Sequence, residues 1–156
     1  MKLSKNLSLK EVTKSNTAIK KGISNNPTHE HLDNLVKLAA NIFQPIREAF
    51  GVPIGISSGY RSIQLNDIIG GSGSSQHCKG EALDLDADIF GGCTNEEIFF
   101  FIRDNLEFDQ LIGEFPNEDG EYKWVHVSYT GSRTNRMMIL EANKVKGRTK
   151  YTRIDG

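Results

Sequence analysis

The spacing of apolar residues along the chain predicts one long helix. In residues 28–50, apolar side chains recur every three or four positions, and Gly51 can end the helix. Pro45 lies inside this segment. We expect it to kink the helix, because a proline ring removes one backbone hydrogen bond.

Three shorter helices are indicated by their capping residues and lengths. A serine or threonine three positions before a glutamate forms a capping box, and this pattern begins at Ser8 and at Thr94. The first of these helices should end near Gly22 and the second at Asn105. The third short helix is expected at residues 63–69.

Alternation of apolar and polar residues predicts strands at 52–57, 82–86, 108–115 and 124–129. The last two are joined by a turn-rich link and should pair as an antiparallel hairpin. Together, the helices and strands favour an α+β fold. We expect a single domain with a central, mostly antiparallel sheet and helices packed against it.

Length and charge limit the possible functions. A chain of 156 residues is expected to form one domain, residues 1–156, with one hydrophobic core, and we expect a monomer. Its net charge of -1 does not favour nucleic acid or an acidic membrane as a partner. Within the domain we distinguish an N-terminal helical segment, residues 1–27, and a basic C-terminal tail, residues 143–156. Such a tail is either solvated or attracts a polyanion.

No targeting or membrane-spanning segment is recognisable. The charged start, residues 1–5, is not followed by an apolar run of signal-peptide length, and no stretch approaches the length of a membrane span. We therefore expect a chain that is made without a signal peptide and is kept in the cytoplasm unless another route exports it.

Two histidines and a carboxylate are the candidate chemistry of this chain. His77 follows a loop rich in glycine and serine, residues 70–75, and the strand after it carries Asp84. His126 lies on one face of the strand 124–129, so a metal ion could join the two strands. Two histidines and one carboxylate are a ligand set of catalytic zinc, which keeps its fourth position for water.

The residues alone leave other interpretations open. A single histidine in a strand, such as His126, is more often a packed or surface side chain than a ligand. His29 and His31 fall in the first turn of a helix, and we expect them to be solvated. Cys78 and Cys93 are too few for a disulfide framework, and we expect Cys78 to be a small buried side chain.

The motif around the two histidines resembles that of the zinc D-alanyl-D-alanine carboxypeptidase family of murein peptidases. The matching positions are Ser75, His77, Gly80, Ala82 and Asp84, followed by Trp124 and His126. The similarity covers most of the chain and includes segments 58–62, 108–114 and 135–136. The resemblance implies that His77, Asp84 and His126 hold one Zn²⁺ in a cleft. It also implies hydrolysis of a peptidoglycan stem peptide, at a D-Ala-D-Ala or an L-Ala-D-Glu bond.

The general base is where the sequence departs from the best-known pattern of these peptidases. Related dipeptidases and phage endolysins place an acid three residues before the last histidine, but that residue is Lys123 here. A lysine cannot deprotonate zinc-bound water at neutral pH without a large pKa shift. Glu114 and Glu121 are the alternatives. A hairpin centred near Gly120 would place Glu114 opposite His126 on the same face, so we favour Glu114 as the base.

Arg61 matches the arginine that faces the substrate in the related dipeptidases. Its guanidinium group suits a substrate carboxylate or the developing oxyanion, and Ser75 or Gln64 could assist it. The resemblance implies that zinc-bound water, activated by a glutamate, attacks the peptide carbonyl. The resemblance of hedgehog signalling domains to these peptidases implies an alternative, a zinc-containing module without catalysis that binds wall peptide or has a structural role in a phage.

The expected substrate also affects the expected place of action. Murein lies outside the cytoplasm, so a murein peptidase without a signal peptide resembles a phage or prophage lysis protein released through a membrane hole. In that setting, the basic tail could hold a polyanionic wall polymer by non-specific attraction.

Overall fold

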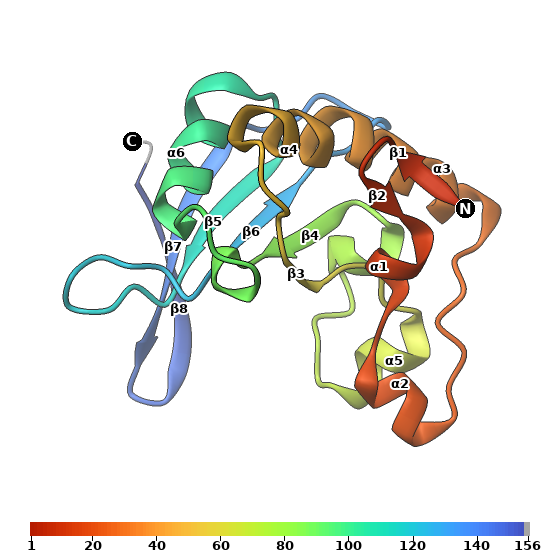
Figure 1. Cartoon of the computed structure of the whole chain (residues 1–156). Coiled ribbons are helices and arrows are strands. Elements are labelled where there is room, and N and C mark those ends of the chain that lie inside the picture. Colours follow the sequence, from red (N-terminus) through yellow and green to blue (C-terminus); the bar gives the residue numbers. More distant parts are fainter. Residues whose placement is uncertain (155–156) are drawn as a thin grey trace.

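A six-stranded sheet forms the centre of the computed structural model, which describes residues 1–154 (Figure 1). The strand order is β3-β4-β6-β5-β7-β8, and every neighbouring pair is antiparallel except β5 and β7. The strands are β3 (Ile56–Ser58), β4 (Ala82–Leu85), β5 (Gln110–Glu114), β6 (Trp124–Ser128), β7 (Met138–Val145) and β8 (Arg148–Arg153). The expected α+β fold with a mostly antiparallel sheet is confirmed.

Helices cover one face of the sheet (Figure 1). The covering helices are α3 (His29–Leu38), α4 (Gln44–Phe50) and α6 (Asn95–Asn105). The short helices α1 (Leu9–Thr13), α2 (Asn16–Lys21) and α5 (Ile63–Ile68) lie at the β3 end of the sheet. Strand residues such as Leu83, Leu111 and Val125 point to α3, α4 and α6 and form the main core. Their neighbours point to the opposite face, because side chains alternate along a strand. No helix within residues 1–154 is long and apolar enough to cross a membrane.

The predicted helix 28–50 is present, and its interruption takes a specific form. A π-helical turn, Ala39–Phe43, joins α3 to α4 directly before Pro45. The Gln44 N–H bonds to the Ala39 carbonyl, so the wider turn replaces the simple kink that we expected. Gly51 ends α4 in the left-handed conformation, as predicted.

The N-terminal part is less continuous than predicted. The expected helix from Ser8 to Gly22 is divided into α1 and α2, because the Ser15 side chain accepts a hydrogen bond from Ala18 N–H and starts a new helix. A small hairpin of β1 (Lys2–Ser4) and β2 (Leu7–Ser8) precedes both helices. The expected strand 52–57 is reduced to β3; Pro53 has no N–H to donate to a neighbouring strand.

The basic C-terminal segment is not an appended tail in its described part. Residues up to Arg153 form the β7–β8 hairpin at one edge of the sheet (Figure 1). The turn is made by Lys146 and Gly147, with φ values of 52° and 78°. Two consecutive positive φ angles give a turn whose twist matches that of paired strands. The remainder of the predicted segment, residues 155–156, lies outside the described residues.

Candidate metal centre and substrate cleft

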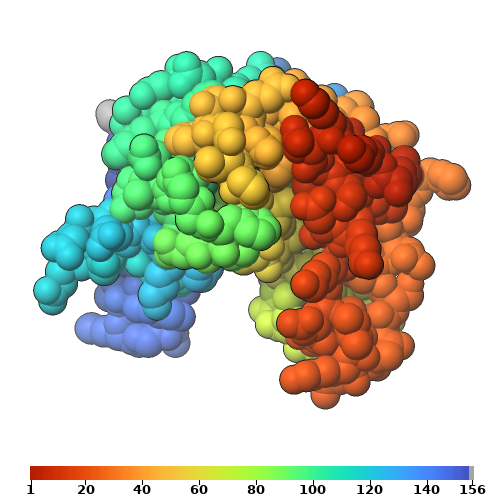
Figure 2. All heavy atoms as spheres, in the orientation of Figure 1, coloured from red at the N-terminus to blue at the C-terminus, as the bar shows by residue number. Residues whose placement is uncertain are grey.

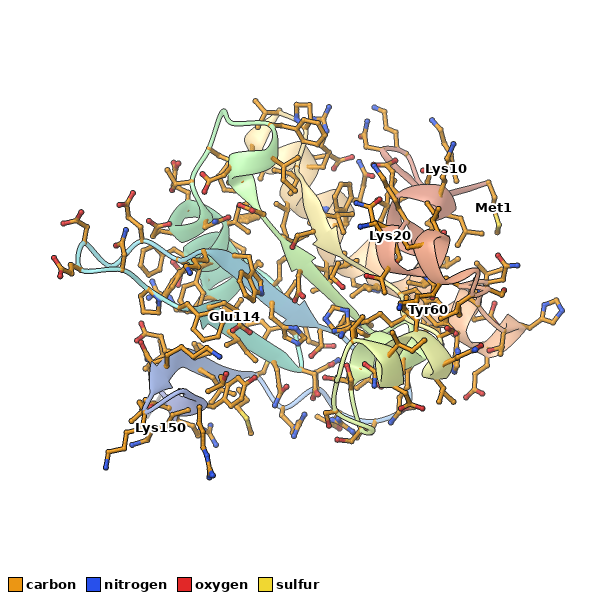
Figure 3. All side chains as sticks on the ribbon, turned by 90° about the horizontal axis from the view of Figure 1, so that it is seen from below. Met1, Lys10, Lys20, Tyr60, Glu114 and Lys150 are labelled. Atoms are coloured by element: carbon orange, nitrogen blue, oxygen red, sulfur yellow. The ribbon has the colours of Figure 1, made fainter. Side chains whose placement is uncertain are left out.

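The sheet face that the helices leave uncovered forms the floor of a cleft of about 1410 Å³. The loop 69–76 lines one end and β8 lines the other. Figure 2 shows the molecule hollowed between the hairpin and the part that contains α2 and α5. Figure 3 views this side, with Glu114 between Tyr60 and the hairpin that carries Lys150. All three predicted metal ligands line this cleft.

The structure brings His77, Asp84 and His126 together. Asp84 on β4 and His126 on β6 are register partners, so both side chains leave the sheet on the same face. His77 lies in the short 3₁₀ turn η2 (Gln76–Lys79). The Asp84 Oδ1 atom is 3.3 Å from His77 Nε2 and 3.0 Å from His126 Nδ1. The three ligand atoms lie within 4.8 Å of one another.

This donor set fits zinc. Ligand atoms at about 2.0–2.2 Å from a tetrahedral ion lie roughly 3.3–3.6 Å apart, close to the two separations from the Asp84 Oδ1 atom. His77 Nδ1 lies 2.7 Å from the Gly59 carbonyl oxygen. If Nδ1 donates to this carbonyl, Nε2 is left free to face Asp84, which is the usual support of a metal-binding histidine.

The charges around the centre also favour metal binding. Burial lowers the pKa of His77 and so favours its neutral form. Burial would raise the pKa of Asp84, but the neighbouring His77 and His126 hold it below its usual range. A neutral imidazole and an ionised carboxylate are the forms that bind a metal ion.

The turn that carries His77 is fixed by local contacts. The Ser75 hydroxyl accepts a hydrogen bond from His77 N–H at 3.2 Å, and Arg61 N–H donates to the His77 carbonyl at 3.1 Å. Gly80 ends the turn with φ at 74°. A Cβ atom there would lie 2.5 Å from the His31 carbonyl oxygen, so the turn can pack against α3 only with glycine at this position.

Glu114 lies in the cleft, but the predicted register is wrong. In the observed hairpin Glu114 faces Trp124, and Ile112 faces His126. The Lys123 N–H donates to the Glu114 carbonyl at 2.8 Å, which closes the hairpin in this register. A shift by two residues keeps every side chain on its face. Glu114 therefore remains on the cleft side, diagonal to His126.

The environment of Glu114 differs from that of Glu121. Glu114 is 7% exposed; its burial, together with the charge of Asp84, raises its pKa to about 7 against the opposing effect of His126. Glu121 is exposed in the link between β5 and β6, where its Oε1 atom accepts from Asn117 Nδ2 at 3.1 Å. Of these two glutamates, Glu114 alone lines the cleft.

The predicted substrate-binding residues are only partly brought together. Arg61 and Ser75 line the cleft, whereas Gln64 is exposed on α5 and does not. Gln76 lines the cleft instead, and sequence reasoning missed it although it directly precedes His77. The Arg61 Nε and Gln76 Nε2 atoms are buried without a hydrogen-bond partner among residues 1–154. Leaving a buried donor without an acceptor is costly.

A second group that the sequence did not reveal supports the cleft wall. Asp109 is fully buried, and both of its oxygens accept hydrogen bonds from the guanidinium groups of Arg133 and Arg136. These partners hold the pKa of Asp109 below its usual range, although burial opposes this. The arrangement fixes the segment after β6, from which both arginines line the cleft.

The remaining candidates from the sequence lie outside the metal centre. Cys78 is buried and Cys93 half-buried, and both thiols are free. Burial of Cys78 agrees with its expected role as a small core side chain. His31 Nδ1 lies 2.9 Å from the Tyr60 hydroxyl. His29 and His31 do not belong to the cluster of candidate ligands found within residues 1–154.

Comparison with known proteins identifies the family. The zinc D-Ala-D-Ala carboxypeptidase of Streptomyces albus G is 33% identical over 86 residues, which are 54% of this chain and 31% of that protein. The chain thus spans about a third of the length of this relative. The sequence profile of peptidase M15 matches residues 5–128, a range that includes His77, Asp84 and His126. With its candidate zinc ligands inside the matched range, the chain belongs to the peptidase M15 family.

Proposed function

We propose that the protein is a zinc-dependent peptidase that hydrolyses a peptide bond in peptidoglycan stem peptides. Glu114 carries this proposal, because its buried carboxyl has a pKa of about 7 and shares a sheet face with Asp84 and His126. A general base is most effective when its pKa is near the working pH. Family membership and the carboxypeptidase relative support peptide hydrolysis and the class of substrate.

Each residue has a distinct part in the proposed reaction. His77, Asp84 and His126 would hold Zn²⁺, which when bound polarises a carbonyl group and lowers the pKa of water. Glu114 accepts the proton of the attacking water and delivers it to the leaving amine. Arg61 binds a carboxylate of the stem peptide through its guanidinium group. Removing one ligand would leave the other two too few for a catalytic zinc site.

The bond that is cleaved is the finer part of the proposal. The name of the relative favours a D-Ala-D-Ala bond, after which the substrate ends in a carboxylate that Arg61 could bind. An L-Ala-D-Glu bond also has a carboxylate near it. We also propose that the protein acts at the cell wall. It would reach the wall by release through a membrane hole, as phage lysis proteins do.

Digestion of purified murein, followed by mass spectrometry of the released fragments, tests the proposal. The zinc-loaded protein should release a free D-alanine or a peptide that begins with D-glutamate, and protein treated with a chelator should release neither until zinc is restored. Glu114→Gln should bind zinc and release at least about a hundredfold less product. A protein that binds murein and zinc but releases nothing would instead be a wall-binding module.

A further inference from the structure

Part of the cleft wall comes from residues that the family profile does not cover. The match to peptidase M15 ends at residue 128, whereas β7 begins at Met138. Nevertheless, Thr149 and Tyr151 of β8 line the same cleft as the candidate zinc ligands. The β7–β8 hairpin therefore contributes residues to the cleft that lie outside the part of the chain matched by the family profile.

The sheet register places Tyr151 in the same cross-strand row as Glu114, two strands away. Glu114 pairs with Ala142 on β7, and Ala142 pairs with Tyr151 on β8, so the three side chains share one face. Neighbouring strands lie about 4.8 Å apart, which puts the backbones of Glu114 and Tyr151 roughly 10 Å apart. Only the methyl group of Ala142 stands between them in this row. The long phenol side chain can therefore extend over the floor of the cleft toward Glu114.

The surroundings of the phenol agree with this placement. Burial, together with the charges of Glu114 and Asp84, raises the pKa of Tyr151. The residue is nevertheless 56% exposed, because one side of it faces the open cleft. Within residues 1–154, its hydroxyl makes no hydrogen bond. The donor is thus available to a molecule in the cleft.

We propose that Tyr151 is a substrate-contacting residue, whose hydroxyl donates a hydrogen bond to a backbone carbonyl oxygen of the peptide bound beside Glu114. This inference rests on the proposed function, because it takes a peptide as the ligand of the cleft. Arg61 and Gln76 lie toward the glycine-rich end and Tyr151 at the hairpin end, so the peptide would be held on both sides of the metal centre.

Two variants of the zinc-loaded full-length protein test the inference. Tyr151→Phe removes the hydroxyl and keeps the ring. Thr152→Ala is the matched control, because Thr152 also carries a hydroxyl but is exposed on the opposite face of β8 and does not line the cleft. The probe is the synthetic pentapeptide L-Ala-γ-D-Glu-L-Lys-D-Ala-D-Ala, which contains both bonds considered above. Zinc content and thermal midpoint should be unchanged in both variants.

We expect Tyr151→Phe to lower kcat/KM by about three- to tenfold, the range for one lost hydrogen bond, with Thr152→Ala within twofold of wild type. Calorimetric titration of the pentapeptide into Glu114→Gln, with and without Tyr151→Phe, should show the same weakening of Kd without catalysis. Values for Tyr151→Phe within twofold of wild type, or equal losses in both variants, would overturn the inference. Failure of the wild type to cleave or bind the pentapeptide would overturn the proposed function and, with it, the peptide as ligand of Tyr151.

Discussion

The substitution Glu114→Gln should have two separate effects. It should remove the loss of folding stability that comes from burying a charged carboxylate, and it should remove the proposed general base. Burial raises the pKa of Glu114 from 4.5 to about 7, so the folded protein holds a proton that the unfolded chain has already lost. The stability that this difference contributes is fully present below pH 4.5 and is lost as the pH rises through 7. A glutamine has no charge to bury, so the variant should not lose this stability.

The expected magnitude follows from the size of the shift. The difference between a pKa of about 7 and one of 4.5 corresponds to roughly 3–4 kcal/mol, at about 1.4 kcal/mol per pKa unit. The cleft is open to water, which screens part of the charge, so we expect about 2 kcal/mol. The free energy of unfolding of Glu114→Gln, relative to wild type, should rise by this amount between pH 5 and pH 8.

Urea denaturation of the metal-free proteins at several pH values measures this difference. Glu121→Gln is the control, because it makes the same chemical change at a carboxylate that is exposed. In the zinc-loaded proteins, Glu114→Gln should lower turnover about a hundredfold or more, whereas Glu121→Gln should have little effect. A relative stability of Glu114→Gln that stays constant from pH 5 to pH 8 would refute the burial argument. Equal turnover in Glu114→Gln and wild type would refute its role as the base.

Three further predictions concern the metal centre and its surroundings. His126→Ala should reduce zinc binding from one ion per chain to a level that dialysis removes, and metal analysis showing full retention would exclude His126 as a ligand. Arg61→Lys keeps the charge but loses the planar fork, so we expect kcat/KM on a cleaved stem peptide to fall about tenfold, and an unchanged value would exclude Arg61 from substrate binding. Gly80→Ala should lower the free energy of unfolding by about 1–3 kcal/mol more than Gly120→Ala, because both glycines have positive φ but only Gly80 lies against a neighbouring carbonyl. Equal urea midpoints for the two variants would contradict this contact.

Much of the fold and the metal centre could be predicted because the determining signals are local. The capping box at Thr94 starts α6, which ends at Asn105 as expected, because the cap and its hydrogen-bonding partners lie within one helical turn. His77 and Asp84 are joined by a short turn and a strand, so their spacing alone restricts how they can meet. Local spacing does not determine the position of His126, because only the pairing of β4 with β6 brings it next to Asp84.

The tertiary structure decided what depends on pairing between distant segments. Apolar alternation fixed the face of β5 that carries Glu114, because a slip of one residue would turn its core side chains to the cleft. A slip of two residues leaves both faces unchanged, so the sequence pattern could not distinguish Trp124 from His126 as the partner of Glu114. The pKa of Glu114 and the position of Tyr151 likewise depend on the insertion of β7 beside β5. Burial and strand order are properties of the assembled sheet, and no single segment of the chain contains them.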